Sequence, residues 1–536
     1  MMEASDAGAA GKQYLRWTYR GEPLDALLRS RPETLPLAPP APGEVIARVE
    51  AVSICSSDIK AVRMGVDHPL LAQAENGGDT VLGHEVSLRV EEVGALQRDR
   101  FRPGQRLGLQ PAMRVDGKRK TIGFDVPGGF AQYLRLDAEA LNAYVFDVPE
   151  KLTAAEIALL EPYGCVERAY RPNARQELLP EGSALIVLGP NSESFDASRP
   201  LRWRRTVVVG TSEKCLPANL GSADLHVSSL AELGNETFDD IVGLGELDAG
   251  ELARLPALLN EGGMLLQARL SAADPVPVDA ARIHYDALSF VGTTSPDILE
   301  ALAPQRQRFD VRPGGTVLVH GAGGAMGRIH VHRLLQLENG PSTVIATSRS
   351  RRRQSDLEED FAALAQAQAK RLVVVQDTDI AAALSREAPA GLDDAVVVVP
   401  DPSAVAEAAR WLAPGGLLAI FAGFAYGNPV LLDLAGVAVS DKRFTGSTGC
   451  SVDDMKDVLA RVERGELDLL ANLKAIGGLR QLPRALEAVD RGEVSGKIVI
   501  YPQAPEAPFR RLAANWDDRQ ETSMLGNRSS QAEREE

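Results

Sequence analysis

Residues 55–85 bring together side chains that could hold a metal: a thiol, an imidazole and a carboxylate. The stretch CSSDIK begins at Cys55, and LGHE ends in His84 and Glu85. Zinc accepts thiolate, imidazole and carboxylate ligands, and a catalytic zinc site keeps one coordination position open. A lone cysteine is more often a small buried apolar residue, so the spacing alone leaves a metal site and ordinary core residues as alternatives.

A glycine-rich turn, GAGGAMG, lies between the apolar strand TVLVH and a helical stretch. It fits the A/G-x-G-x-x-G spacing of dinucleotide-binding turns, in which the middle glycine lets the backbone approach a pyrophosphate. The start of the helix would turn its N–H groups toward the phosphates. The alternative is a glycine-rich turn without a ligand. The residues that we predict at a dinucleotide are Ala322, Gly324, Ala325, Met326 and Gly327.

The strand that follows this turn ends in TVIATSRSRRR, which bears on the choice of nucleotide. Ser348 stands where NAD sites usually place an acid for the ribose hydroxyls, and Arg349 and Arg351 follow it. A 2′-phosphate favours a hydroxyl and a guanidinium, which can bind it in a bidentate manner. The sequence therefore favours NADP(H) over NAD(H), unless the arginines only form the solvated start of a helix.

Two kinds of element must position these two sites. Residues 13–170 are rich in short alternating or β-branched runs separated by glycine and proline, which is typical of β-structure. From about residue 182 the pattern changes to strand–helix alternation, with almost continuously apolar strands such as DAVVVVPD. Such strands are buried on both faces, so we predict an α/β fold with a doubly wound parallel sheet.

Two parts of this α/β region resemble each other. LLNEGGMLLQARL (258–270) is similar to WLAPGGLLAIFAG (411–423), and LSFVGTT is similar to KRFTGST. We infer two consecutive Rossmann-like units, at about 182–303 and 312–445, with duplication or shared architecture as alternative origins. The first unit has Pro190 and acidic residues where the glycines should be, so its phosphate site is predicted to be inactive.

Composition narrows the classes of partner. The formal net charge is −16, which argues against nucleic acid because a phosphate backbone requires a basic surface. Four scattered cysteines fit a reducing compartment. The N-terminus lacks the apolar core of a secretion signal, and the longest apolar run is too short to span a bilayer. We expect a cytoplasmic protein with a small-molecule substrate, no nucleic-acid partner and no membrane association.

Several motifs resemble the zinc-containing medium-chain dehydrogenase/reductase family, which is alcohol dehydrogenase-like. They include GEVIARVEAVSICSSDIK, VLGHEVSLRVEEVG, GGFAQYLRL, ALLEPYGCV, the glycine turn and ALEAVDRGEVSGKIVIYP, and they cover about 43–170 and 312–502. SSDIK, GHEVSL, EPYGCVERAY and GAGGAMGRIHV look most like the L-sorbose 1-phosphate reductase group. The resemblance implies a GroES-like, β-rich catalytic domain joined to a Rossmann domain.

The resemblance also implies a ligand set. Cys55 and His84 would bind one catalytic zinc, and Glu85 would be a direct or intermittent ligand. Glu161 would bind directly or through water, and Cys165 lies one helical turn beyond it as a further candidate. No cysteine lies between Cys55 and Cys165, so the lobe that holds structural zinc in many relatives is absent and we expect one zinc per chain.

Neighbouring residues would support the chemistry. Asp58 would accept a hydrogen bond from His84 and fix its tautomer. Ser57 matches the hydroxyl that relays a proton from a zinc-bound alcohol. Lys60, Arg63 and His68 could meet a substrate phosphate, although a solvent-facing basic helix is an equally good interpretation.

The fold class that we predict is α/β: a GroES-like domain plus a Rossmann sheet, with a second, degenerate Rossmann-like unit inserted. The expected segments are a disordered tail at 1–12, the GroES-like catalytic domain at 13–170, the degenerate unit at 171–311, the nucleotide-binding Rossmann domain at 312–450, a return to the catalytic domain at 451–502 and a disordered tail at 503–536.

The expected function is zinc-dependent hydride transfer between a nicotinamide cofactor and a polyol or ketose, with sugar phosphates included. The alternatives are a zinc-free quinone or enone reductase of the same superfamily and a non-catalytic NADPH-binding protein. Relatives commonly dimerise by joining their Rossmann sheets edge to edge. The inserted unit would take the place of the partner subunit, with residues 292–294 pairing beside 446–448 in a continuous sheet. The chain would then be a monomer through internal duplication, the alternative being a homodimer.

Overall fold

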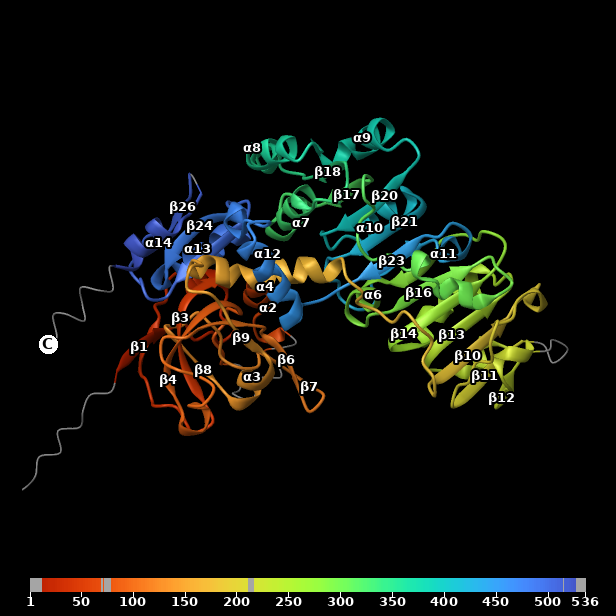
Figure 1. The fold of residues 1–536 in the computed structure, drawn as a ribbon, viewed down its shortest axis with the longest axis horizontal. Coiled ribbons are helices and arrows are strands. Elements are labelled where there is room, and N and C mark those ends of the chain that lie inside the picture. The colour runs from red at the N-terminus through yellow and green to blue at the C-terminus, as the bar shows by residue number, and fades with distance from the viewer. Residues whose placement is uncertain (1–11, 69–70, 72–78, 211–215, 514, 527–536) are drawn as a thin grey trace, which may run out of the picture. The chain divides into compact units, whose positions relative to one another are not determined.

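The computed structural model describes residues 12–68, 71, 79–210, 216–513 and 515–526. The chain divides into two compact units, one formed by Met1–Gly164 with Cys450–Glu536 and the other by Cys165–Gly449 (Figure 1). The predicted combination of a GroES-like domain with Rossmann-type sheets is confirmed, whereas the exact segment limits given above stay predictions.

The first unit is built on a largely antiparallel sheet, in the order β26-β24-β25-β3-β4-β5-β9, with β8 paired to β3. Alternating apolar residues from these strands fill one hydrophobic core. The strands are β3 (Val45–Ser53), β4 (Glu85–Val93), β5 (Arg106–Leu109), β8 (Tyr133–Leu136), β9 (Val145–Asp147), β24 (Leu473–Gly478), β25 (Lys497–Tyr501) and β26 (Arg510–Arg511). Two hairpins add β1 (Gln13–Arg16) with β2 (Glu33–Pro36) and β6 (Ala112–Val115) with β7 (Lys118–Thr121).

Short helices surround this sheet. They are α1 (Leu24–Leu27), α2 (Ser56–Met64), α3 (Ala138–Ala143), α12 (Val452–Glu463), α13 (Leu482–Asp490) and α14 (Asp518–Leu525), and the longer α4 (Ala154–Ala169) leads into the second unit. Among the described residues, no helix is both long enough and apolar enough to cross a bilayer.

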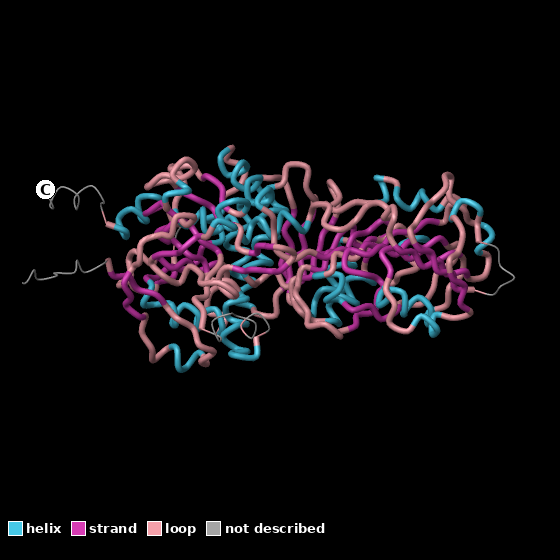
Figure 2. The backbone as a smooth tube through the Cα atoms, turned by 90° about the horizontal axis from the view of Figure 1, so that it is seen from below, coloured by secondary structure: helices cyan, strands magenta, loops and turns pink. Residues whose placement is uncertain are grey.

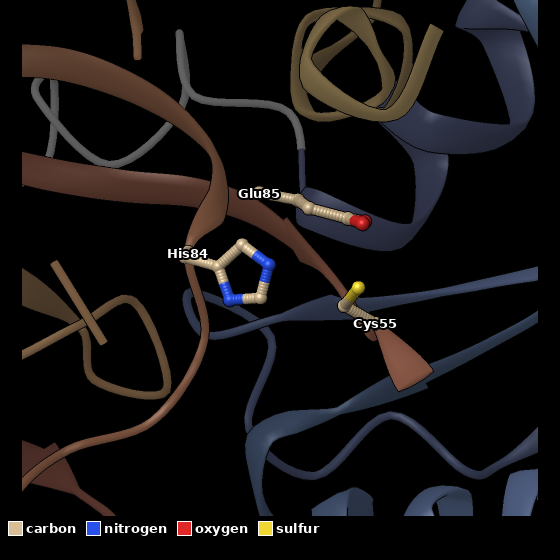
Figure 3. Close-up of side chains that lie close together, drawn as sticks. All are labelled: Cys55, His84 and Glu85. Carbon is tan, nitrogen blue, oxygen red and sulfur yellow. The ribbon is translucent and has the colours of Figure 1, made fainter. Parts of the chain in front are cut away.

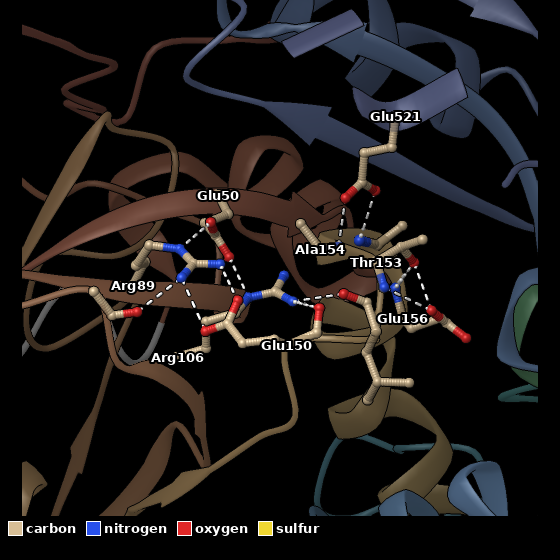
Figure 4. A network of polar contacts seen from close by, with 11 residues as sticks. Glu50, Arg89, Arg106, Glu150, Thr153, Ala154, Glu156 and Glu521 are labelled. Atoms are coloured by element: carbon tan, nitrogen blue, oxygen red, sulfur yellow. Dashed lines mark hydrogen bonds and ion pairs between the residues drawn. The ribbon is translucent and has the colours of Figure 1, made fainter. Parts of the chain in front are cut away.

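The segment from 503 on, expected to be a disordered tail, is ordered over its described part. It contributes β26 and α14, and Trp516 is buried. Glu521 on α14 accepts hydrogen bonds from the first amides of α4 and from the Tyr501 hydroxyl at 2.8 Å. Figure 4 shows this carboxylate beside the network of Glu50 with two arginines that ties β3, β4 and β5 together. The polar composition of this segment did not predict its order, because the few side chains that anchor it contact residues that are distant in sequence.

The second unit contains two six-stranded parallel sheets of identical topology. Their orders are β12-β11-β10-β13-β14-β16 and β19-β18-β17-β20-β21-β23, each the doubly wound 3-2-1-4-5-6 arrangement. In Figure 2 the strands of this unit form a central layer with helices on both sides. The first copy has β10 (Ser183–Leu188), β11 (Arg205–Val209), β12 (Leu225–Val227), β13 (Phe238–Leu244), β14 (Leu259–Ala268) and β16 (Ser289–Thr293); the second has β17 (Thr316–His320), β18 (Thr343–Thr347), β19 (Arg371–Val375), β20 (Leu392–Val397), β21 (Leu412–Ile420) and β23 (Arg443–Gly446).

The two copies differ in their helices. The second has α7 (Ala325–Gln336), α8 (Arg351–Ala367), α9 (Ile380–Glu387), α10 (Pro402–Arg410) and the short α11 (Gly436–Val439). The α-helices in the described residues of the first are α5 (Ala249–Arg254) and α6 (Ala280–Tyr285). Where α7 follows β17, the first copy has a single 3-10 turn after β10. A separate apolar cluster that includes Phe195 and Leu201 covers that face of the first sheet instead.

Matching buried contacts support duplication of one ancestral unit. Asp240 on β13 pairs with Arg175 at 2.7 Å, and Asp394 on β20 pairs with Arg308. Each carboxylate also accepts the backbone amide four residues after its arginine, at 2.8 and 2.7 Å. In both copies the strand register shifts immediately before the aspartate. Burying a charge is costly unless it is paired and hydrogen-bonded, so shared architecture alone gives little reason for the same network to occur twice.

The two copies meet at a junction with approximate twofold symmetry. A short strand precedes the last strand in each copy, and these two, β15 (Val276–Asp279) and β22 (Pro429–Leu432), pair antiparallel. α6 of the first copy packs on β23, and α11 of the second packs on β16. The expected continuous sheet is wrong: β16 and β23 approach each other, but no ladder joins them among the described residues, because the short helices and the β15–β22 ribbon make the contact.

Candidate metal and nucleotide sites

Two strands and a helix meet at the candidate metal group. β3 ends two residues before Cys55, which is the N-cap residue of α2. Glu85 is the first residue of β4 and lies opposite Ser53 in the antiparallel ladder, with His84 just before it. The sulfur of Cys55, a ring nitrogen of His84 and a carboxylate oxygen of Glu85 lie within 4.8 Å of one another. Figure 3 shows the three side chains turned toward one another.

Asp58 fixes the backbone on both sides of this group. Its fully buried carboxylate accepts hydrogen bonds from the Cys55 amide at 2.9 Å and from the Gly83 amide at 3.2 Å. Nδ1 of His84 lies 3.7 Å from the same carboxylate, an ion-pair distance rather than the predicted hydrogen bond. On the other side of the ring, the Ser57 hydroxyl lies 3.5 Å from Nε2 of His84. Asp58 and Ser57 thus both lie beside the His84 ring, and the roles expected of them stay predictions.

The surroundings of His84 are strongly anionic. Burial by itself would lower the pKa of His84, but its contact with Cys55 and the charges of Asp58 and Glu161 raise that pKa to about 10. A group that attracts a proton this strongly carries surplus negative charge. Sulfur, nitrogen and oxygen donors with such a surplus fit a zinc ion, and the partly exposed Cys55 leaves one side of the group open.

Lys497 is a partner of this group that sequence reasoning missed. It lies on β25, is fully buried, and its Nζ is 2.6 and 2.7 Å from the two carboxylate oxygens of Glu85. The Ile54 carbonyl accepts a further hydrogen bond from it at 3.0 Å. Burial lowers the pKa of Lys497, but the charge of Glu85 raises it overall. Only the pairing of β25 with β3 brings this lysine to a carboxylate so distant in sequence.

Glu161 and Cys165 occupy successive turns of α4, as predicted, and each offers a ligand atom within 4.8 Å of the other. Glu161 is buried, and its charge influences both His84 and Lys497. It does not belong to the group of three whose ligand atoms lie within 4.8 Å of one another. The geometry therefore favours Glu85 over Glu161 as the nearest carboxylate.

The basic residues after Cys55 are mostly engaged within the protein. Arg63 pairs with Asp490 at 2.7 Å. His68 is buried and stacks on the Phe124 ring at 5.5 Å, and burial lowers its pKa. Lys60 is exposed on α2. Of the three residues considered for a substrate phosphate, Lys60 and Arg63 are exposed, and Arg63 is engaged in its ion pair with Asp490.

The glycine turn combines open space at Gly324 with close packing at Gly327. Gly324 is the N-cap residue of α7, and a methyl group placed on it would meet no atom within 4 Å. Ala325 and Met326 begin the helix, and Gly324 offers no side-chain cap to its first amides, which have no partners within the helix. A methyl group on Gly327 would lie 2.4 Å from the Gly321 carbonyl oxygen, so this glycine permits close packing of helix and strand.

Two further glycines of the turn were not among the predicted residues. Gly321 has φ +93°, a conformation that other residues rarely adopt. A methyl group on Gly323 would lie 2.5 Å from the Ser348 hydroxyl and 3.1 Å from Cβ of Arg353. The motif spacing could have indicated both, since every residue of the turn except Ala322, Ala325 and Met326 is glycine. The contact also places Ser348 directly against the turn.

Arginines surround Ser348 as the sequence predicts. Arg349 and Arg351 are exposed, and Arg353 is half-buried. Burial lowers the pKa of the Arg353 guanidinium. Arg352, by contrast, pairs with Asp356 at 3.1 Å. No ion pair holds the other three arginines among the described residues, which leaves positive charge beside the turn for an anionic ligand.

Known proteins resemble this chain in sequence and in fold. Residues 41–149 match the alcohol dehydrogenase GroES-like domain. An L-sorbose 1-phosphate reductase of Klebsiella pneumoniae is 30% identical over 161 residues, which cover 30% of this chain and 38% of that protein. A sorbitol dehydrogenase of Bacillus subtilis is 26% identical over 307 residues, covering 51% of this chain and 82% of that protein. The solved structure of 2R,3R-butanediol dehydrogenase from Bacillus subtilis superposes with a TM-score of 0.52 at 16% identity, covering 92% of this chain and all of that one.

Proposed function

We propose that this chain, which is similar to alcohol dehydrogenase-like proteins, is a zinc-dependent oxidoreductase of the medium-chain dehydrogenase/reductase family that uses a nicotinamide nucleotide. Its substrate would be a polyol or the corresponding ketose, free or phosphorylated. The observation that carries the proposal is the convergence of Cys55, His84 and Glu85 within the region that matches the GroES-like domain.

In this proposal Cys55 and His84 would bind the zinc ion, and Glu85, the carboxylate grouped with them, would be a direct or intermittent ligand. The bound zinc supplies Lewis-acid chemistry to a substrate oxygen, and the nicotinamide supplies hydride chemistry at the adjacent carbon. Asp58 keeps the Cys55 and Gly83 backbones in place for ligation. Lys497 holds Glu85 by an ion pair, so Glu85 would bind a zinc ion only with that pair loosened or shared.

Ser57 is the proposed proton relay. Its hydroxyl is within 3.5 Å of His84 and lies at the partly exposed start of α2. A hydroxyl there can take a proton from a substrate alcohol beside the metal group and release it toward solvent. Glu161 is proposed as a second carboxylate that acts on the metal directly or through water.

NADP(H) is the proposed nucleotide. Ser348 contacts the glycine turn, and Arg349, Arg351 and Arg353 lie around it without an ion-pair partner among the described residues. The 2′-phosphate of NADP(H) would give these guanidinium groups an anionic partner. An acid, which would favour the ribose hydroxyls of NAD, is absent at position 348.

The polyol or ketose class rests on sequence similarity to proteins with such names. The L-sorbose 1-phosphate reductase and the sorbitol dehydrogenase both act, by name, on hydroxylated carbon chains. The chain spans only 38% of the first of these relatives. Exposed Lys60, just beyond the metal group, is a basic side chain available to a substrate phosphate.

The test is a turnover panel on the full chain with the metal measured on the same sample. We expect one zinc per chain, and NADPH oxidation in the presence of ketoses or ketose phosphates, with the reverse reaction on the polyols. Removing zinc with a chelator should abolish turnover, and adding zinc back should restore it. Active protein without zinc would indicate a quinone or enone reductase, and NADPH binding without any turnover would indicate a non-catalytic protein.

A further inference from the structure

The first Rossmann copy lacks a glycine turn, yet it touches the second copy beside the strand ends where a nucleotide would bind. Parallel α/β sheets bind ligands outside the carboxyl ends of their strands, where the strand order reverses. In the second copy that reversal lies between β17 and β20. The segment 421–428 leaves β21 at this same edge, because the amides of Phe421 and Ala422 both donate to the Val397 carbonyl at the end of β20, at 3.0 Å.

The start of this segment also touches the helix of the glycine turn. The ring of Phe421 meets the ring of His330 on α7 edge-on, with 4.5 Å between ring centroids. His330 is in turn held by the Tyr170 hydroxyl at 2.7 Å from Nδ1. The position of Phe421 is thus coupled to the element whose N-terminus would receive the pyrophosphate.

The remainder of the segment is held by the first copy. Nδ1 of His284 on α6 donates a hydrogen bond to the Ile420 carbonyl at 3.2 Å, and His284 is buried. The Gly427 amide donates to Asp279 at 2.8 Å, and the Tyr426 hydroxyl donates to Asp286 at 2.8 Å. The segment therefore lies between the nucleotide-binding copy and a helix that belongs to the other copy.

The junction is symmetric in its backbone but not in its side chains. Gly446, at the end of β23, packs on α6, and a methyl group on it would lie 2.8 Å from Cα of His284. Gly292, in the corresponding strand β16, packs on α11, and a methyl group on it would lie 2.9 Å from Ala438. His284 and Ala438 thus occupy equivalent places. Of these two equivalent helix residues, only His284 has a side chain that can donate a hydrogen bond.

We propose that the first copy serves as a built-in second subunit whose His284 positions the segment 421–428 for nucleotide binding. The inference rests on the proposed nucleotide binding of the second copy and adds a role for the copy that has lost its own phosphate turn. His284 is a positioning residue: it acts through the backbone of Ile420 and Phe421. One chain then contains one nucleotide site, completed by residues from both copies.

The test compares three variants of the full chain by fluorescence titration with NADPH and by steady-state kinetics. His284→Phe removes the donor, and we expect the NADPH dissociation constant and KM to rise roughly fivefold, the factor for losing about one net hydrogen bond, with a smaller change in kcat. His284→Asn places an amide N–H near the original Nδ1 and should restore both values to within about twofold of wild type.

Arg306→Met is the matched control, because it loosens the same junction on the opposite side. Arg306 donates to the carbonyls of Gly292 and Ala438, at 3.0 and 3.2 Å, next to the copy without a glycine turn. We expect Arg306→Met to lower the melting temperature without weakening NADPH binding. If His284→Phe does not fold, Gly423→Ala takes its place, since the added methyl would lie 2.6 Å from the Tyr285 hydroxyl and push the segment away from α6.

The NADPH affinities of these variants distinguish failure of this inference from failure of the proposed function. Unchanged NADPH affinity in both His284→Phe and Gly423→Ala would overturn the inference while leaving the proposed function intact. Equal weakening by Arg306→Met would overturn it as well, because the effect would then be general loosening. Wild-type protein that binds neither NADPH nor NADH would refute the proposed function itself and this inference with it.

Discussion

Substitution of Cys55 or His84 tests the proposed zinc site most directly. Cys55→Ser removes the thiolate while keeping the backbone bond between its amide and Asp58. We expect bound zinc to fall below about one tenth of the wild-type content and turnover to fall at least about a hundredfold, because a hydroxyl is a poor zinc ligand. Metal analysis and ketose-dependent NADPH oxidation on one sample measure both effects.

Cys215→Ser is the control for this change, since Cys215 lies in the sequence of the first Rossmann-like unit and outside the residues 41–149 that match the GroES-like domain. It should retain zinc and activity. Retention of a full zinc equivalent by Cys55→Ser would contradict the proposed ligand set.

Arg353 and Arg352 offer a matched pair for nucleotide choice. Arg353 is half-buried against the glycine turn, whereas Arg352 already pairs with Asp356. Arg353→Gln should raise KM for NADPH about tenfold, the effect of losing one charge-assisted hydrogen bond, and leave KM for NADH unchanged. Arg352→Gln should change neither value. Equal losses for the two nucleotides in Arg353→Gln would show that this arginine does not contact a 2′-phosphate.

At the scale of elements, α4 depends on a carboxylate from the far end of the chain. Glu521 caps the first amides of α4 and accepts the Tyr501 hydroxyl. Glu521→Gln replaces one acceptor oxygen by a donor, so we expect the free energy of unfolding to fall by about 1–3 kcal/mol. Urea denaturation at neutral pH measures the change. Glu506→Gln, which affects only an exposed pair with Arg480, should cost less than about 0.5 kcal/mol, and an equal cost in both would contradict the capping role.

His330 gives α7 a pH-dependent stability. Burial, together with the charge of the neighbouring Arg333, lowers the pKa of His330 from 6.5 to about 3. The folded state therefore stays neutral where the unfolded state binds a proton, so stability is full above pH 6.5 and is lost as the pH falls toward 3. At pH 5 the expected loss is about 2 kcal/mol.

His330→Asn isolates this contribution. Its amide oxygen can still accept the Tyr170 hydroxyl, but the side chain no longer titrates. Between pH 6.5 and pH 5 the variant should lose about 2 kcal/mol less unfolding free energy than wild type, as measured by urea denaturation. The exposed His226→Asn variant should behave as wild type, and identical pH profiles for all three proteins would contradict the assignment.

At the scale of the whole molecule, the internal junction predicts a monomer. The β15–β22 ribbon and the short helices occupy the edge strands β16 and β23, and one apolar core runs through both copies. A surface already covered within the chain is not available to a second chain. Light scattering should give a mass near 57.4 kDa, and titration should give one NADPH per chain. A mass of twice this value, or two NADPH per chain, would contradict the prediction.

Much of the site could be read from the sequence where local pattern decides structure. The glycine turn sits between an apolar strand and a helix, so its place at the carboxyl end of β17 follows from short-range geometry. Ser348 likewise follows from the length of one strand–helix–strand unit. Lys497 could not be predicted, because a lysine four hundred residues away reaches Glu85 only through a strand pairing that no local pattern records.

The sequence by itself determined the donor types at 55, 84 and 85, the phosphate turn at 321–327 and the repetition of a Rossmann-like unit, because each is a property of neighbouring residues. Only the tertiary structure decided that Glu85 rather than Glu161 forms one group with Cys55 and His84, that the tail beyond 503 anchors α4, and that the two copies meet through β15 and β22 rather than in one sheet. These depend on contacts between distant segments, whose free energies are set by burial and pairing in the folded chain.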